Sequence, residues 1–155
     1  MAKLSVVATP IGNLQDITLR ALRVLKEADV IACEDTRVTA KLLAKYEIEK
    51  PLIIFHAQSG KLATERILTL LSEGKRVALV TDAGTPGISD PGNELVSQIR
   101  TRLPDARVEA IPGASALTAA LSIAGAPTHE FVFLGFLPHK KGRQTLFKEI
   151  ADSER

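Results

Sequence analysis

The 155-residue sequence contains one cysteine, one tyrosine, one methionine and no tryptophan. A single cysteine, Cys33, can form neither a disulfide within the chain nor a cysteine zinc cluster. The histidines His56, His129 and His139 are scattered, so we expect no metal site. No apolar run approaches the roughly 20 residues that cross a bilayer. The N-terminus also lacks the apolar stretch of a signal peptide, and we expect a cytoplasmic protein with no membrane partner.

Several sequence motifs of common enzymes are also missing. The chain has no G-x-G-x-x-G dinucleotide fingerprint, no G-x-x-x-x-G-K-[ST] phosphate loop and no G-x-S-x-G nucleophile elbow. These absences disfavour nicotinamide, nucleoside triphosphate and serine hydrolase chemistry. The composition that remains, 45% hydrophobic and 25% charged, is typical of a globular protein.

The net charge of +2 is distributed unevenly along the chain. Residues 1–138 hold 15 basic and 15 acidic side chains, whereas residues 139–155 hold five basic and three acidic ones. Lys140, Lys141 and Arg143 lie close together in this last segment. Such a cluster can contact phosphate, or it can simply be a solvated loop, and the residues alone leave both interpretations open.

Apolar, β-branched runs alternate with segments of helical periodicity along most of the chain. We predict strands at residues 4–8, 30–33, 52–55, 76–80 and 108–111. We predict helices that begin at a capping Asp16 and at residues 36, 63, 91 and 115. Strands that alternate with helices pair in parallel through right-handed crossovers. The fold class we expect is α/β, with a doubly wound, mainly parallel five-stranded sheet that binds its ligand at the carboxyl ends of the strands.

The last part of the chain is predicted to begin a second domain. We expect a first α/β domain over residues 1–124, a linker over 125–130 and the start of a second α/β domain over 131–155. The second part would hold a strand at 131–134 and a helix from residue 143. One strand and one helix cannot enclose a core, so we expect the sequence to end soon after this domain begins.

Glycine, proline and small polar residues gather in three loops, at residues 9–14, 81–92 and 112–116. Each loop follows a predicted strand, and the carboxyl ends of parallel strands share one edge of a sheet. Glycine lets the backbone approach a ligand closely. We therefore expect these loops to present backbone N–H and C=O groups to a small polar molecule.

Individual side chains near this edge allow two interpretations each. Asp82 can accept hydrogen bonds from a ligand, whereas Asp90, directly before a proline, is better explained as a cap of the next helix. Thr85 can bind a ligand or fold its loop. His56 can act as a base or be structural, and Cys33 is expected to be a buried strand residue.

The turn Glu34-Asp35-Thr36-Arg37 follows the second predicted strand. Asp35 can cap the next helix while Arg37 is simply exposed. Alternatively, the two side chains form a polar cluster that orients a substrate hydroxyl.

Five segments, taken in order, resemble one known family. They are residues 7–22 (VATPIGNLQDITLRAL), residues 34–37 (EDTR) with 41–43 (KLL), residues 80–92, residues 111–116 and residues 135–138 (GFLP) with their basic tail. The sequence resembles the 16S ribosomal RNA (cytidine 2′-O)-methyltransferases, the small-subunit methyltransferase I type of the tetrapyrrole methylase superfamily. This resemblance covers a first domain and only part of a second.

The resemblance implies an S-adenosylmethionine-dependent enzyme of two α/β domains that forms a homodimer. Its substrate would be a ribose 2′-hydroxyl of a cytidine in small-subunit ribosomal RNA. The residues that the resemblance assigns to the cofactor pocket are Pro10, Gly12, Asp82, Ala83, Gly84, Thr85, Ile88, Ser115 and Ala116.

A ribose hydroxyl is a weak acid, so its methylation needs a base or a polarising partner. The candidates are Asp35 and His56, with Arg37 or Lys41 placing a neighbouring phosphate. RNA contacts are also expected from Lys140, Lys141 and Arg143. Two alternatives remain open at this point: a C-methyltransferase of a tetrapyrrole, and a non-catalytic nucleotide-binding domain.

Overall fold

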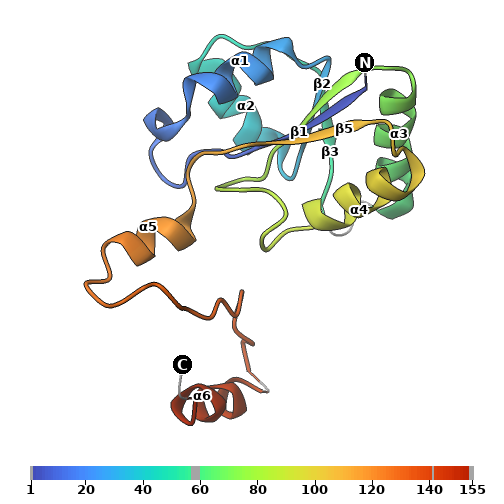
Figure 1. The fold of residues 1–155 in the computed structure, drawn as a ribbon. Coiled ribbons are helices and arrows are strands. Elements are labelled where there is room, and N and C mark those ends of the chain that lie inside the picture. Colours follow the sequence, from blue (N-terminus) through green and yellow to red (C-terminus); the bar gives the residue numbers. More distant parts are fainter. Residues whose placement is uncertain (1, 57–59, 141, 154–155) are drawn as a thin grey trace. The chain divides into compact units, whose positions relative to one another are not determined.

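The computed structural model describes residues 2–56, 60–140 and 142–153 (Figure 1). In chain order the elements are β1 (Lys3–Val7), the 3₁₀ helix η1 (Leu14–Asp16), α1 (Leu19–Glu27), β2 (Val30–Cys33), α2 (Thr36–Lys45), β3 (Leu52–Ile54), α3 (Gly60–Ser72), β4 (Arg76–Leu79), α4 (Gly92–Arg102), β5 (Arg107–Ile111), α5 (Ala116–Ser122) and α6 (Arg143–Ala151). The five predicted strands and the helices between them are confirmed, with ends shifted by a few residues at most.

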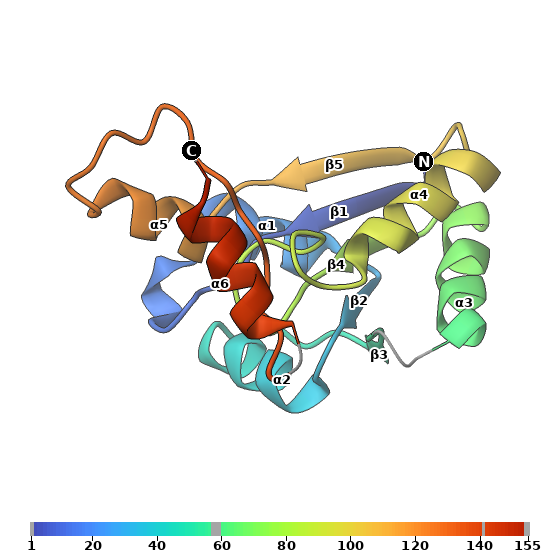
Figure 2. The ribbon, with the colours of Figure 1, turned by 90° about the horizontal axis from the view of Figure 1, so that it is seen from below.

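The strands form one sheet in the order β3-β2-β4-β1-β5, which Figure 2 shows as a succession of arrows. Every strand pair is parallel. Parallel neighbours need crossover connections, and α1 to α4 supply them. This confirms the doubly wound α/β class. It also places the carboxyl ends of all five strands on one edge of the sheet.

Helices cover both faces of the sheet. On one face, Ile67 and Leu71 of α3 and Leu95 and Ile99 of α4 pack on strand residues that include Leu4. On the other face, α1 and α2 pack on a second cluster, which contains Val7, Ile31 and Cys33. Successive strand residues point to opposite faces, so the short apolar strands serve both cores. Cys33 is fully buried, as expected for a strand residue.

The start of α1 differs from the prediction. Asp16 belongs to η1, and the helix begins at Leu19. Thr18, in an extended conformation, caps it by accepting the Ala21 N–H on Oγ1 at 3.0 Å. A threonine hydroxyl satisfies one of the unpaired donors at the helix start, so the Asp16 cap is wrong and the equivalent interaction comes two residues later.

The C-terminal residues form a separate unit. The described chain divides into Met1–Ala119 and Ala120–Arg155, a division that falls within α5. Residues 131–134 do not form the predicted strand, and their side chains are exposed. A strand needs a partner for its backbone N–H and C=O groups, and no described strand pairs with this segment. The helix expected from Arg143 is present, as α6. No helix in the described parts of the chain is long and apolar enough to cross a membrane.

Helix α1 offers a matched test of the core. Leu25 is fully buried between α1 and the sheet, whereas Leu19 of the same helix is 86% exposed. We expect Leu25→Ala to lower the free energy of unfolding by about 2–5 kcal/mol, because it leaves a cavity. Leu19→Ala should change it by less than about 0.5 kcal/mol. Urea unfolding followed by circular dichroism measures both, and equal effects would contradict the packing described for α1.

Candidate functional site

Three loops meet at the carboxyl edge of the sheet, and we call residues 9–14, 81–92 and 112–116 together the loop rim. Thr9 and Gly84 exchange backbone hydrogen bonds at 2.9 and 3.0 Å. The Thr9 hydroxyl donates to the Thr81 carbonyl at 3.0 Å. The Thr85 hydroxyl donates to the Ala114 carbonyl at 3.3 Å, which gives Thr85 a loop-folding contact. The expectation that the three loops share one edge is confirmed.

Gly84 occupies the centre of the loop rim and needs to be glycine. Its φ of +84° lies in the left-handed region that side chains disfavour. A Cβ there would also lie 3.5 Å from Ile11 and 3.8 Å from the Ala114 carbonyl oxygen. Both distances are ordinary van der Waals contacts, so it is the backbone conformation, and not a lack of space, that favours glycine here.

Asp90 closes the long loop onto the start of α4. Its Oδ1 accepts the N–H groups of Gly87 at 2.8 Å and Gly92 at 2.9 Å. The N-cap position itself belongs to Pro91, which makes no side-chain capping bond. Asp90 is therefore structural, as expected, but it is not the helix cap that was predicted: it lies one residue before the cap and holds the loop to the first turn of α4.

Carboxylates of two strand ends gather beside the loop rim. The Thr81 hydroxyl donates to Glu34 Oε2 at 2.8 Å, and the Asp35 N–H donates to Asp82 Oδ1 at 3.0 Å. Desolvation of its carboxylate raises the pKa of Asp82, and the nearby charges of Glu34 and Asp35 raise it further. Sequence reasoning named Asp82 and Asp35 but missed the contact between them, because their 47-residue separation gives no local signal.

Asp35 caps α2 and pairs with Arg37. Its Oδ1 accepts the Arg37 N–H at 2.8 Å, and its Oδ2 accepts from Arg37 Nη2 at 2.6 Å. The Arg37 side chain holds the pKa of Asp35 down to about 2. A carboxylate of such low pKa is ionised at neutral pH and accepts a proton poorly. Asp35 and Arg37 together can instead orient a hydroxyl or a phosphate group.

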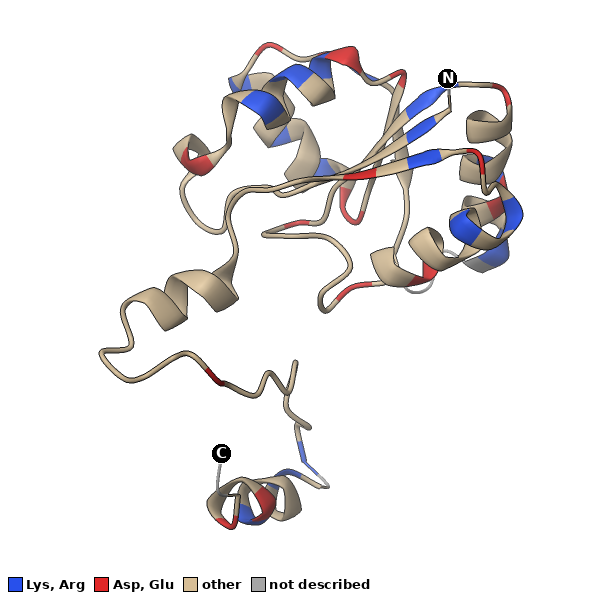
Figure 3. Ribbon diagram, in the orientation of Figure 1, with Lys and Arg blue, Asp and Glu red and all other residues tan. Residues whose placement is uncertain are grey.

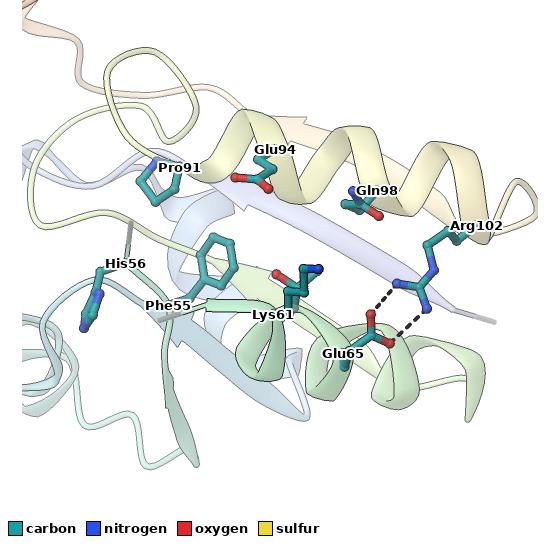
Figure 4. A pocket seen from close by; sticks show the side chains of 9 residues that line it. Phe55, His56, Lys61, Glu65, Pro91, Glu94, Gln98 and Arg102 are labelled. Carbon is teal, nitrogen blue, oxygen red and sulfur yellow. Dashed lines mark hydrogen bonds and ion pairs between the residues drawn. The ribbon is translucent and has the colours of Figure 1, made fainter. Parts of the chain in front are cut away.

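His56 lies in a different hollow, a pocket of about 470 Å³ between α3 and α4 (Figure 4). Phe55 and Pro91 lie at the same end of the pocket as His56. The bidentate ion pair of Arg102 and Glu65 lies farther along the two helices. The pocket is lined by Phe55, His56, Lys61, Thr64, Glu65, Pro91, Glu94, Gln98 and Arg102. The three predicted catalytic residues are therefore divided: Asp35 and Arg37 border the loop rim, and His56 borders this pocket. The pocket itself had no signal in the sequence.

Three further predicted residues, Ile88, Lys140 and Arg143, are exposed. Ile88 is exposed in the long loop of the rim, and Lys140 is exposed in the C-terminal unit. Arg143 begins α6 and its guanidinium lies 5.5 Å from the centre of the Phe147 ring. Lys141 lies outside the described residues. Among the described residues, no group of three His, Cys, Asp or Glu side chains could hold a metal ion.

The chain is similar to proteins of one family over nearly its whole length. The family model of the Tetrapyrrole (Corrin/Porphyrin) Methylases matches residues 3–154. Over 155 residues the chain is 50% identical to the Ribosomal RNA small subunit methyltransferase I of Thermotoga maritima, and it covers 69% of that protein. Over 154 residues it is 47% identical to the protein of the same name from a Hydrogenobaculum species, with 98% of this chain and 65% of that protein covered.

A solved structure is similar in fold. The crystal structure of uroporphyrin-III-C-methyltransferase from Thermus thermophilus matches 84% of this chain and 55% of that chain, with a TM-score of 0.61 and 28% identity. The chain thus spans about two thirds of the two curated relatives and about half of this structure.

The pairing of Asp35 with Arg37 predicts an acid-shifted titration. In Arg37→Gln the pKa of Asp35 should rise from about 2 towards 3.8, because the guanidinium is the main cause of the depression. A depressed folded-state pKa stabilises the fold above the unfolded value, and this stabilisation is lost as the pH falls from about 4 to 2. Carbon-13 NMR of the carboxyl group measures the shift. Arg23→Gln is the control, and an Asp35 midpoint unchanged by Arg37→Gln would refute the pairing.

Gly92 permits a second test, of the loop after β4. A Cβ at Gly92 would lie 2.9 Å from Asp90 Oδ1 and 3.0 Å from the Gly87 nitrogen. We expect Gly92→Ala to lower the free energy of unfolding by about 1–3 kcal/mol, because the crowded loop must shift. Gly12→Ala meets no atom within 4 Å and should leave the stability nearly unchanged. Thermal unfolding of the two variants compares them, and equal stabilities would contradict the Asp90 contacts.

Proposed function

The chain belongs to the tetrapyrrole (corrin/porphyrin) methylase family, and from that membership we propose that the protein is an S-adenosylmethionine-dependent methyltransferase of small-subunit ribosomal RNA. The proposed acceptor is the ribose 2′-hydroxyl of a cytidine. The names of its relatives support the RNA substrate. The observation that carries the proposal is the loop rim, a backbone-lined edge that holds no lysine or arginine.

The chemistry of the loop rim fits this cofactor. The three loops contain two carboxylates and no basic residue, and one of the carboxylates, Asp90, is used to fold its loop. Such a surface suits a ligand with a sulfonium and an ammonium group better than it suits a phosphate ester. Asp82 keeps its second carboxylate oxygen for amino or hydroxyl groups of the ligand. S-adenosylmethionine, when bound, supplies the methyl group.

The loop residues have defined parts in this proposal. Asp82 accepts hydrogen bonds from the cofactor, and the small side chains leave room for it to lie against the backbone. Pro10 and Gly12 form part of the floor. The other residues proposed to line the site are Ala83, Gly84, Thr85, Ile88, Ser115 and Ala116.

The acceptor side is proposed to lie next to Asp35 and Arg37. Methyl transfer is an in-line displacement, so the hydroxyl oxygen would have to lie in line with the methyl carbon and with the sulfur whose bond to that carbon breaks. Asp35 can accept a hydrogen bond from the hydroxyl, and the exposed Arg37 can bind the adjacent phosphate. With its pKa of about 2, Asp35 orients the hydroxyl rather than taking its proton. His56, the other predicted base, lines the separate pocket between α3 and α4, so no base for this hydroxyl is assigned among the residues beside Asp35.

Contacts with RNA and a second subunit complete the proposal. Lys41 of α2 and Lys140, Lys141 and Arg143 of the C-terminal segment bind RNA phosphates. We also propose that the protein acts in the cytoplasm as a homodimer, which the resemblance implies. A second candidate, methylation of a tetrapyrrole carbon, is favoured by the similarity to the uroporphyrin-III-C-methyltransferase structure.

Tritiated methyl transfer tests the reaction. The complete gene product should label small ribosomal subunits, and digestion of the RNA should yield 2′-O-methylcytidine by mass spectrometry. Uroporphyrinogen III should accept no methyl group. Labelling of the tetrapyrrole instead of the RNA would establish the second candidate, and labelling of neither would refute both.

The cofactor site is tested by calorimetry with S-adenosylmethionine. We expect Asp82→Asn to weaken binding about 10- to 100-fold, since a hydrogen bond to a charged group contributes about 1.5–3 kcal/mol. Asparagine can still accept the Asp35 N–H, so the local fold should remain. The exposed Asp105→Asn is the matched control. Equal affinities of the two variants would exclude Asp82 from the site.

A further inference from the structure

The neutral charge sum of residues 1–138 conceals a local excess of basic residues on two helices, where Figure 3 colours several segments blue. Helices α1 and α2 together carry six basic side chains and one acidic one, Glu27. We call these six the α1–α2 basic face: Arg20, Arg23, Lys26, Arg37, Lys41 and Lys45. Both helices pack on the same side of the sheet, through one shared apolar cluster. Most of the compensating acidic residues lie in loops.

On α1 the basic residues lie opposite the core. The buried residues Ala21, Val24 and Leu25 define one side of the helix. At about 100° per residue, Arg20, Arg23 and Lys26 fall within one third of the circumference, centred on Arg23 and facing away from that side. All three are exposed.

On α2 the basic residues form a single row. Arg37, Lys41 and Lys45 follow one another at intervals of four residues, which places them on one stripe with a spacing of about 6 Å along the axis. The buried residues Thr39, Leu42 and Leu43 lie on the other side. All three basic residues of the stripe are exposed.

Most of this charge is not neutralised within the fold. Arg20 lies 3.8 Å from Glu109, and Arg37 pairs with Asp35. Arg23, Lys26, Lys41 and Lys45 form no ion pair with any carboxylate of the described residues. An unpaired row of cations held by two packed helices is a preorganised site for a polyanion.

The helices on the opposite side of the sheet lack this excess. Helix α3 carries two basic residues and one acidic one, and so does α4. Two of these charges, Arg102 and Glu65, neutralise each other. The helices on the α1–α2 side of the sheet therefore carry a larger excess of basic residues than those on the α3–α4 side.

We propose that the α1–α2 basic face binds the sugar-phosphate backbone of the small-subunit ribosomal RNA. The proposal rests on the proposed function for the identity of the RNA. What this proposal adds to the proposed function is the surface of the first unit that holds the RNA. The expected ligand groups are phosphates, because the face presents positively charged side chains along two helices. Neither helix carries an aromatic side chain that could stack on a base. Arg37 and Lys41 connect the face to the Asp35 cluster at the loop rim.

A charge-removal variant tests the face. The variant Arg23→Gln/Lys26→Gln/Lys45→Gln leaves out Arg37 and Lys41, which the proposed function already uses. The matched control, Arg66→Gln/Lys75→Gln/Arg100→Gln, removes three exposed charges from α3, α4 and the turn after α3. Affinity of the complete gene product is measured for protein-free small-subunit ribosomal RNA and for intact small subunits, at several salt concentrations. Unfolding temperatures confirm that both variants fold.

The α1–α2 variant should bind the RNA about 10- to 100-fold more weakly at 0.1 M salt. Its slope of log affinity against log salt should become less steep by about 2–3, because each lost phosphate contact removes about 0.7–0.9. The control should match the wild type. Equal slopes for the two variants would overturn the proposal, as would a loss seen with intact subunits and not with free RNA, because the partner would then be a ribosomal protein. Cofactor calorimetry and methyl transfer are scored separately, so failure of the proposed reaction is distinguishable from failure of this surface.

Discussion

The reciprocal backbone pair between Thr9 and Gly84 is the interaction on which the candidate site depends. It joins the loop after β1 to the loop after β4, and β1 and β4 are neighbours in the middle of the sheet. The pair needs both the parallel register, which brings the two carboxyl ends to one edge, and a glycine in the left-handed region. The hydroxyl of Thr9 adds a bond to Thr81, so the threonine is held by backbone and side chain alike. The loop rim is therefore a consequence of the sheet order rather than of loop sequence alone.

The features predicted correctly from the sequence are those with a local signal. Apolar runs and helical spacing predicted all five strands, and loop composition predicted the shared edge. The features that were missed depend on residues far apart in the chain. The Asp35–Asp82 contact, the Thr81–Glu34 contact and the pocket beside His56 join separate strands or helices. The strand expected at residues 131–134 failed for the related reason that β structure needs a partner, which periodicity does not supply.

Two opposite electrostatic surfaces lie close together in the first unit of the chain. The loop rim has no basic residue, whereas α1 and α2 have six. A cationic cofactor and an anionic RNA need such different surfaces, and a uniformly basic protein would hold the RNA at the expense of the cofactor. Segregation of the charges lets a near-neutral chain present both surfaces, which the proposed cofactor and the proposed RNA substrate would require. The net charge of the chain alone therefore does not reveal how its charges are distributed over the fold.

The pKa values of two neighbouring carboxylates, Asp35 and Asp82, are shifted in opposite directions. Arg37 lowers the pKa of Asp35 to about 2, while desolvation and the adjacent carboxylates raise the pKa of Asp82. The same Asp35 residue donates its backbone N–H to Asp82, so the two carboxylates are positioned by one turn. The ionised Asp35 accepts side-chain hydrogen bonds from Arg37, which orient the guanidinium. In the proposed reaction, a carboxylate of such low pKa is too weak a base for a ribose hydroxyl, so the proposed part of the Asp35–Arg37 pair is orientation.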